Sequence, residues 1–230
     1  MARPTLSSYL RDHLDHVGKK KEPGPFVTIS RQYGCDGAEV GQALVERLNA
    51  RSEDDPDKQW RVYERQFLRQ LAEDTGYSEE QLERERLTRP SILKDIYRGI
   101  RHSSVPDGFE IRTKVAQMIR TAAFDGYAVI IGHGGAAATV DLSNGLNVRL
   151  EAPKDWRIAR VAARENLTRQ GALGVIDSIE KRRRFVRRLY QQQSRGGGFH
   201  LSIDNAVFDA EQIADLLVRA MEDKGLVERE

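Results

Sequence analysis

Short apolar segments rich in β-branched residues alternate with longer segments of helical periodicity along this chain. The first segment, 26–29, precedes a helical pattern that ends near Asn49. Similar short segments stand at 60–63, 127–131, 146–150 and 200–203. The connections are long enough for right-handed crossovers, so the alternation predicts a three-layer α/β fold in which helices cover both faces of a parallel sheet.

The chain before the first strand is predicted to be an addition to this fold. Leu6, Leu10 and Leu14 recur at helical spacing, and a lysine run and a proline-glycine-proline linker then end the pattern. We therefore divide the chain into an N-terminal helix and linker over 1–25 and a domain over 26–224. Further helical patterns in the domain lie at 91–102, at 109–125 and, strongly basic, at 175–195.

The charge and cysteine content exclude several classes of protein. The chain has 37 basic and 35 acidic side chains, and this near balance argues against binding nucleic acid through bulk charge. Its one cysteine, Cys35, excludes an intrachain disulfide framework and favours a reducing compartment. There is neither an apolar run of the ~18 residues that a membrane span needs nor a signal-peptide core. We expect a cytoplasmic protein without membrane or nucleic-acid partners.

The turn after the first strand has the features of an anion site. Residues 30–39 lead from the strand into a helix through a turn that contains Gly34 and Gly37. Ligands of parallel sheets bind at the carboxyl ends of the strands, and a helix N-terminus favours a phosphate. The strict P-loop sequence is absent, because no glycine-lysine-serine or glycine-lysine-threonine occurs and Asp36 adds a negative charge. A purely structural turn is the alternative interpretation.

Residues 26–41 and several later segments follow one another in the order of a known family. The first has the strand, the serine-arginine-x-x-glycine turn and the helix of that family's opening, which also lacks the P-loop lysine. The later segments are Val62-Tyr63-Glu64-Arg65, the turn Gly132-His133-Gly134, the element Ala152-Pro153 and the helical segment Glu180-Lys181-Arg182-Arg183. In order and spacing, residues ~26–223 resemble the cytidylate kinase-like family.

The resemblance implies a nucleoside monophosphate kinase with a P-loop NTPase fold. Such an enzyme transfers the γ-phosphoryl group of ATP to CMP or a related nucleoside monophosphate, with Mg²⁺. The resemblance also implies an acceptor-binding segment over 63–105 and a mobile lid over 175–199. This chain departs from the family pattern because Cys35 and Asp36 replace serine and glycine, His133 replaces the usual arginine, and the lid is short.

Candidate donor contacts follow from this resemblance. The turn residues expected at ATP are Ser30, Gly34, Cys35, Asp36, Gly37, Ala38 and Glu39. Arg31 either pairs with a carboxylate or, as a catalytic residue, contacts the phosphates in place of the missing lysine. Glu39 either complements the helix dipole alone or is also an outer-sphere partner of Mg²⁺.

Candidate acceptor and lid contacts lie further along the chain. The resemblance places Tyr63, Glu64 and Arg69 in the acceptor region, and His133 follows a neighbouring strand. Structural roles are the alternatives for Tyr63, as a buried residue at the sheet edge, and for His133. Arg183 and Arg187 lie i, i+4 on the basic helix, so both can reach the transferring phosphoryl group when the lid closes. A solvated charged face is the alternative.

The leading hypothesis is a cytoplasmic nucleotide kinase that acts by positioning and charge stabilisation. One rival is a nucleotide-binding module without turnover, for which Asp36 and His133 would be signs of lost chemistry. A second rival, an RNA-binding protein acting through the basic helix at 181–195, is disfavoured by the near-neutral charge and the lack of interleaved aromatic residues. The acceptor base and the oligomeric state stay open.

Overall fold

The computed structural model describes residues 23–51, 55–88, 107–193 and 198–229, and in 186–193 it describes the backbone only. The helices predicted within 1–22 and at 91–102 lie outside these residues. The strands are β1 Phe26–Arg31, β2 Arg61–Tyr63, β3 Ala128–Ile131, β4 Gly145–Glu151 and β5 Leu201–Asp204. The α-helices are α2 Gly37–Arg51, α3 Gln66–Thr75, α4 Glu79–Arg86, α6 Gly108–Asp125, α7 Gly135–Ala138, α8 Lys154–Glu165, α9 Arg169–Gln193 and α10 Ala210–Asp223.

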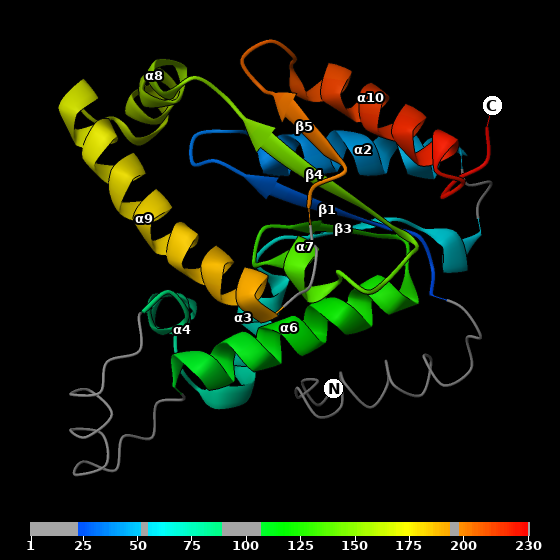
Figure 1. Ribbon diagram of the computed structural model, residues 1–230, viewed down its shortest axis with the longest axis horizontal. Helices are drawn as coiled ribbons and strands as arrows, with labels where there is room; N and C mark the ends of the chain where they lie inside the picture. Colours follow the sequence, from blue (N-terminus) through cyan, green and yellow to red (C-terminus); the bar gives the residue numbers. More distant parts are fainter. Residues whose placement is uncertain (1–22, 52–54, 89–106, 194–197, 230) are drawn as a thin grey trace.

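The five strands form one parallel sheet in the order β2-β3-β1-β4-β5 (Figure 1). The central strand, β1, pairs with β3 and β4, so that Ile29 stands opposite Ile131 on one side and Val148 on the other. Most residues of these strands are apolar and buried, because both faces of a parallel sheet are covered. The predicted parallel sheet is confirmed.

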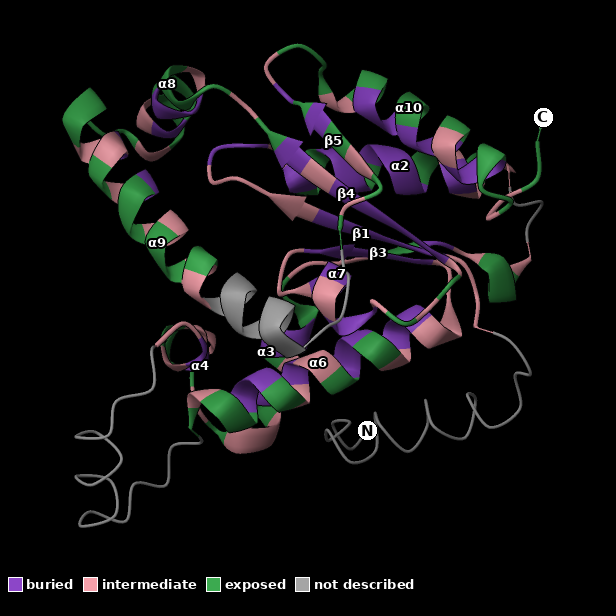
Figure 2. Cartoon of the chain, in the orientation of Figure 1, coloured by how far each residue is buried: buried purple, intermediate pink, exposed green. Residues whose placement is uncertain are grey.

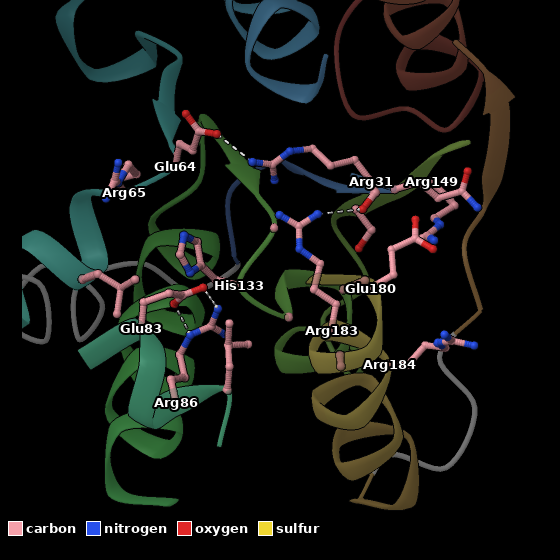
Figure 3. Close-up of a pocket in the computed structure, with 18 of the residues that line it drawn as sticks. Arg31, Glu64, Arg65, Glu83, Arg86, His133, Arg149, Glu180, Arg183 and Arg184 are labelled. Carbon is pink, nitrogen blue, oxygen red and sulfur yellow. Dashed lines mark hydrogen bonds and ion pairs between the residues drawn. The ribbon is translucent and has the colours of Figure 1, made fainter. Parts of the chain in front are cut away.

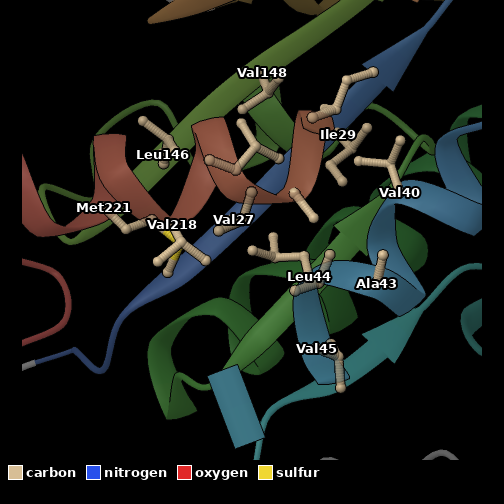
Figure 4. Packing of buried hydrophobic residues seen from close by; sticks show 14 of the residues in the cluster. Val27, Ile29, Val40, Ala43, Leu44, Val45, Leu146, Val148, Val218 and Met221 are labelled. Carbon is tan, nitrogen blue, oxygen red and sulfur yellow. The ribbon is translucent and has the colours of Figure 1, made fainter. Parts of the chain in front are cut away.

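Helices cover both faces of the sheet, as predicted. Val27 and Ile29 point to one face, where they pack with residues of α2 and α10 (Figure 4). Phe26 and Ile130 belong to the second cluster, on the opposite face, with residues of α3, α4 and α6. Successive side chains of a strand alternate between the faces, so one short strand supplies both cores. Figure 2 shows that burial is concentrated on the strands and on the helix sides that cover them.

Helices α8 and α9 lie beyond the carboxyl ends of β1 and β4 (Figure 1). They pack on each other through a small third cluster that contains Ile158, Val161, Ala172 and Ile176, with Tyr33 packed against it. The carboxyl edge of the sheet faces α9, and this arrangement positions the candidate site.

A short 3₁₀-helix, Pro56–Lys58, precedes β2, and the Asp55 side chain caps it by accepting a hydrogen bond from the N–H of Asp57. Two local predictions need correction. Trp60 precedes β2 instead of opening it, since its N–H donates to the Asn49 side chain. The basic helix begins earlier, at Arg169, because its first turns complete the cluster with α8.

Candidate active site

A cavity of about 610 Å³ opens at the carboxyl ends of the central strands (Figure 3). Its walls come from the ends of β1 and β4, the turns after β2 and β3, and helices α3, α4 and α9. Six arginines and three glutamates line it, which gives an excess of positive charge. These charged residues are Arg31, Arg65, Arg86, Arg149, Arg183, Arg184, Glu64, Glu83 and Glu180. Such an excess in a concave site favours an anionic ligand.

Two of the arginines are held by glutamates that also line the cavity. Arg31 Nη2 lies 2.7 Å from Glu64 Oε1, and Arg86 contacts both carboxylate oxygens of Glu83 at 2.7 Å. Burial acts to raise the pKa of Glu83, but the charge and hydrogen bonds of Arg86 outweigh it and lower that pKa below its usual value. Glu83 is therefore ionised, and the pair is electrically balanced.

The positive charge of Arg183 is less compensated than the charges of Arg31 and Arg86. Its Nη1 donates to the backbone oxygen of Arg31 at 3.3 Å, and no ion pair with a carboxylate is found for it within the described residues. Burial lowers the pKa of Arg183 to about 10, and the neighbouring charge of Arg31 adds to this effect. The guanidinium still carries its charge at neutral pH, in a place that is unfavourable for it until an anion arrives.

The turn 30–39 forms a tight connection between β1 and α2. Gly34 has φ of 100°, and a Cβ there would stand 2.9 Å from Arg157 Cβ, so glycine is required. A Cβ on Gly37 would meet Arg31 Cδ at 2.3 Å, and one on Gly132 would meet Arg31 Nη1 at 2.7 Å. The Arg31 side chain therefore packs between the turn and the end of β3, and it joins the turn to the cavity.

The backbone N–H groups of this turn are partly engaged. The N–H of Cys35 donates to the backbone oxygen of Gln32, and the N–H of Asp36 donates to Asn205 Oδ1. In the described part of the chain no acceptor is found for the N–H groups of Gly34, Gly37 and Ala38. Helix α2 begins here, and the first N–H groups of a helix have no partner within it. Of these three residues, Gly34 and Gly37 are buried and Ala38 is exposed.

The charged side chain of the turn is tied to α8. Asp36 forms an ion pair with Arg160. The neighbouring Arg157 donates to the backbone oxygen of Tyr33 and contacts Glu180 on α9 at 2.5 Å. Cys35 is buried, and burial raises the pKa of its thiol to about 11. The negative charge of Asp36 is therefore offset by a cation, and Cys35 is a protonated packing residue.

Five of the predicted site residues meet at the cavity: Ser30, Arg31, Glu64, His133 and Arg183. The remaining turn residues, Gly34 to Glu39, do not line it, and Ala38 and Glu39 are exposed at the start of α2. The turn therefore presents a second, neighbouring surface instead of a wall of the same cavity.

The other three predicted residues lie elsewhere. Tyr63 stacks on Phe67, with ring centroids 5.4 Å apart, because β2 is the sheet edge and α3 covers it. Arg69 lies on the outer face of α3, where it contacts Glu79 at 3.4 Å. The side chain of Arg187 lies outside the described residues.

Sequence reasoning missed several lining residues, above all Glu83, Arg86 and Arg149. The first two are i, i+3 neighbours in α4, whose start the Ser78 capping box marks clearly. Arg149 is a charged residue between the buried Val148 and Leu150 of β4, and its Cζ lies 5.8 Å from the centroid of the Phe199 ring. A charged residue in a strand that is buried on both faces was the feature of the sequence that could have indicated Arg149 as a site residue.

Within the described ranges, no group of three or more histidine, cysteine, aspartate or glutamate side chains is arranged to hold a metal ion. Over the same ranges, no helix has the length and apolar character needed to cross a membrane.

Comparison with solved structures places this fold among known ones. An uncharacterized protein from Eubacterium ventriosum superposes with a TM-score of 0.60 at 18% identity, over 86% of this chain and 98% of that one. The shikimate kinase of Acinetobacter baumannii, in complex with shikimate, superposes with a TM-score of 0.46 at 14% identity, over 90% of this chain and 97% of that one. The shikimate kinase of Bacteroides thetaiotaomicron superposes with a TM-score of 0.46 at 14% sequence identity, over 86% of this chain and 96% of that one. No curated protein was found to match the chain.

A family model decides the relationship. The cytidylate kinase-like family matches residues 26–206, which include the turn after β1, the cavity and α9. This range is most of the chain, and it agrees with the resemblance seen in the sequence. The chain belongs to the cytidylate kinase-like family.

Proposed function

We propose that this protein is a nucleotide kinase that transfers the γ-phosphoryl group of ATP to CMP or a related nucleoside monophosphate. The observation that carries the proposal is Arg183, a partly buried guanidinium at the cavity wall that forms no ion pair with a described carboxylate. Phosphoryl transfer needs cations where negative charge spreads in the transition state. Family membership supports the same class of reaction.

The acceptor would occupy the cavity. Its volume, about 610 Å³, suits a small ligand, and its positive excess suits a phosphate group. Arg31 and Arg183 would hold the phosphate end, since an arginine can give a phosphate two parallel hydrogen bonds. A nucleoside monophosphate is already anionic, so the reaction needs no separate general base.

The donor would occupy the turn between β1 and α2. The N–H groups of Gly34, Gly37 and Ala38, which have no acceptor in the described chain, would donate to its phosphates, and Arg31 lies between this turn and the cavity. Mg²⁺ bound with ATP would neutralise part of the phosphate charge, and the exposed Glu39 at the start of α2 would contact it through water. ATP supply makes the cytoplasm the expected compartment.

A nucleotide-binding module without turnover is the second candidate. It is favoured by the ion pairs that already engage Arg31 with Glu64 and Asp36 with Arg160. In such a protein these pairs would persist when nucleotide binds, and no arginine would move to the reacting phosphate.

A phosphoryl-transfer screen separates the two candidates. The purified chain would be incubated with ATP·Mg²⁺ and each of CMP, dCMP, UMP and AMP, beside the Arg31→Ala variant. A kinase would turn over at least one acceptor, and Arg31→Ala would lose most of that activity. An exposed neighbour of the lid arginine, Arg182, supplies the control Arg182→Ala. Nucleotide binding without product in the wild-type chain would support the binding module.

A further inference from the structure

The cavity has two unlike walls. On the side of β1 and α9 stand Arg31, Arg183 and Arg184, which give it positive charge. On the side of α3 and α4 stand Leu68 and Leu87, together with the balanced pair of Glu83 and Arg86 and with Arg65, whose charge Glu79 offsets. A nucleoside monophosphate is divided in the same way, with a charged phosphate at one end and a neutral, flat base at the other.

His133 belongs to the second wall. Figure 3 shows its ring between Glu64 and the pair of Glu83 and Arg86. The turn that carries it has three successive residues with positive φ, namely 75° at Gly132, 53° at His133 and 86° at Gly134. A side chain other than glycine is strained in this region, so the chain holds an imidazole here at a cost of about 1–2 kcal/mol.

The imidazole is electrically neutral and incompletely bonded. Burial lowers the pKa of His133 to about 3, and the charges of Arg86 and Arg31 add to this effect, while the charge of Glu83 and a hydrogen bond to the Glu64 backbone oppose it. Its Nδ1 is buried and has no hydrogen-bond partner among the described residues. A neutral imidazole has one donor and one acceptor. Because the Glu64 backbone engages the donor, the unpartnered Nδ1 is the acceptor that can meet an uncharged donor group of a ligand. It is a poor contact for a phosphate.

We propose that His133 reads the base of the acceptor nucleotide by a neutral hydrogen bond and thereby sets which nucleoside monophosphate is used. The inference rests on the proposed function, in that the cavity must hold a nucleotide. The phosphate then points to Arg31 and Arg183, and the base lies against α3 and α4, beside Leu68 and Leu87. His133 is thus a specificity residue, distinct from the arginines that would act on the phosphoryl group.

The test compares ligands that differ only by the base. Calorimetry would give Kd values for CMP, UMP and AMP and for ribose 5-phosphate, which has the sugar and phosphate alone, all without ATP. The variants are His133→Gly, which removes the ring and the backbone strain, and His133→Asn, which replaces the ring by an uncharged amide and tolerates positive φ. Asn166→Gly is the matched control, because Asn166 has φ of 52°, is exposed and lies outside the cavity.

We expect the wild-type chain to bind one nucleotide at least tenfold more tightly than ribose 5-phosphate. His133→Gly should remove about tenfold of this preference, which corresponds to about 1.4 kcal/mol, and leave the Kd for ribose 5-phosphate within twofold. His133→Asn should recover part of the preference, and Asn166→Gly should preserve it. Equal loss for both ligands, or no loss, would overturn the inference, as would a wild-type chain without base preference. Base-selective binding without phosphoryl transfer would instead overturn the proposed function alone.

Discussion

Arg183 Nη1 donates a hydrogen bond to the backbone oxygen of Arg31, at 3.3 Å, and so connects α9 to the end of the central strand. The same guanidinium lies over the Tyr33 ring, with its Cζ 5.5 Å from the ring centroid. It is therefore held in place by a carbonyl and an aromatic face, neither of which neutralises its charge. A cation fixed in this way before a ligand arrives is preorganised for a phosphate.

Replacement of Arg183 by alanine tests this role. The guanidinium would act mainly on the charge that spreads in the transition state. We expect Arg183→Ala to lower kcat about a hundredfold and to change KM for either nucleotide much less. Arg182→Ala should be near neutral, since Arg182 is exposed and lies outside the cavity. If steady-state kinetics give the two variants the same values, the arginines of α9 form a solvated face only.

The ion pair between Asp36 and Arg160 makes a second prediction. It holds a carboxylate at the turn where ATP is proposed to bind, with only 11% of the Asp36 side chain exposed. Asp36→Asn should remove a charge that repels phosphate and free Arg160, so ATP should bind several-fold more tightly. The loss of the ion pair in Asp36→Asn should lower the free energy of unfolding by less than about 1 kcal/mol, as for other partly exposed ion pairs.

The reverse substitution supplies the control. Arg160→Ala leaves Asp36 without its cation, so ATP should bind more weakly than to the wild-type chain. The double variant should return towards the wild-type Kd, because both charges are then removed together. Titration of ATP against all four proteins measures this cycle. Weaker binding by Asp36→Asn would show instead that the carboxylate has a positive role at the donor site.

Sequence alone predicted the sheet well because its strands are short, apolar and separated by strong turn signals. The turns after β1 and β3 were found for a related reason: parallel strands bring their carboxyl ends to one edge. Ser30, Arg31 and His133 therefore meet as expected from topology. The family resemblance added Arg183, whose position on α9 no local pattern determines.

The wall formed by α4 could not be predicted, because it depends on how that helix packs. Glu83 and Arg86 face the cavity, and Arg112 on α6 donates to the backbone oxygen of Arg86 at 2.9 Å. This contact joins residues 26 positions apart in the chain. Helical spacing indicates which residues share a side, but not which neighbour that side meets. Arg69 shows the same limit, since its pattern is equally compatible with the outer face that it occupies.

Cys35 provides a test of the turn's packing. Its side chain is 5% exposed, and burial raises the pKa of the thiol to about 11, so little thiolate exists at pH 8. We expect a thiol-disulfide reagent to modify the native protein at least a hundredfold more slowly than the unfolded chain. The rate of absorbance change in buffer and in denaturant measures this difference. Equal rates would mean that the turn opens freely, contrary to the close approach of Gly34 to Arg157.

The buried imidazole of His133 makes stability depend on pH. Its pKa is about 3 in the folded protein and near 6.5 in the unfolded chain, so between these values the unfolded chain binds more protons. The contribution of His133 to stability is therefore complete above pH 6.5 and falls as the pH drops towards 3, by at most about 1.4 kcal/mol per pH unit.

Denaturant unfolding at pH 7 and pH 5 measures the slope of the unfolding free energy against pH. His133→Asn should flatten it. His200→Asn should flatten it less, because His200 is exposed, although burial and the charge of Lys224 lower its pKa. Wild-type and His133→Asn proteins with parallel profiles would show that the ring titrates in contact with solvent.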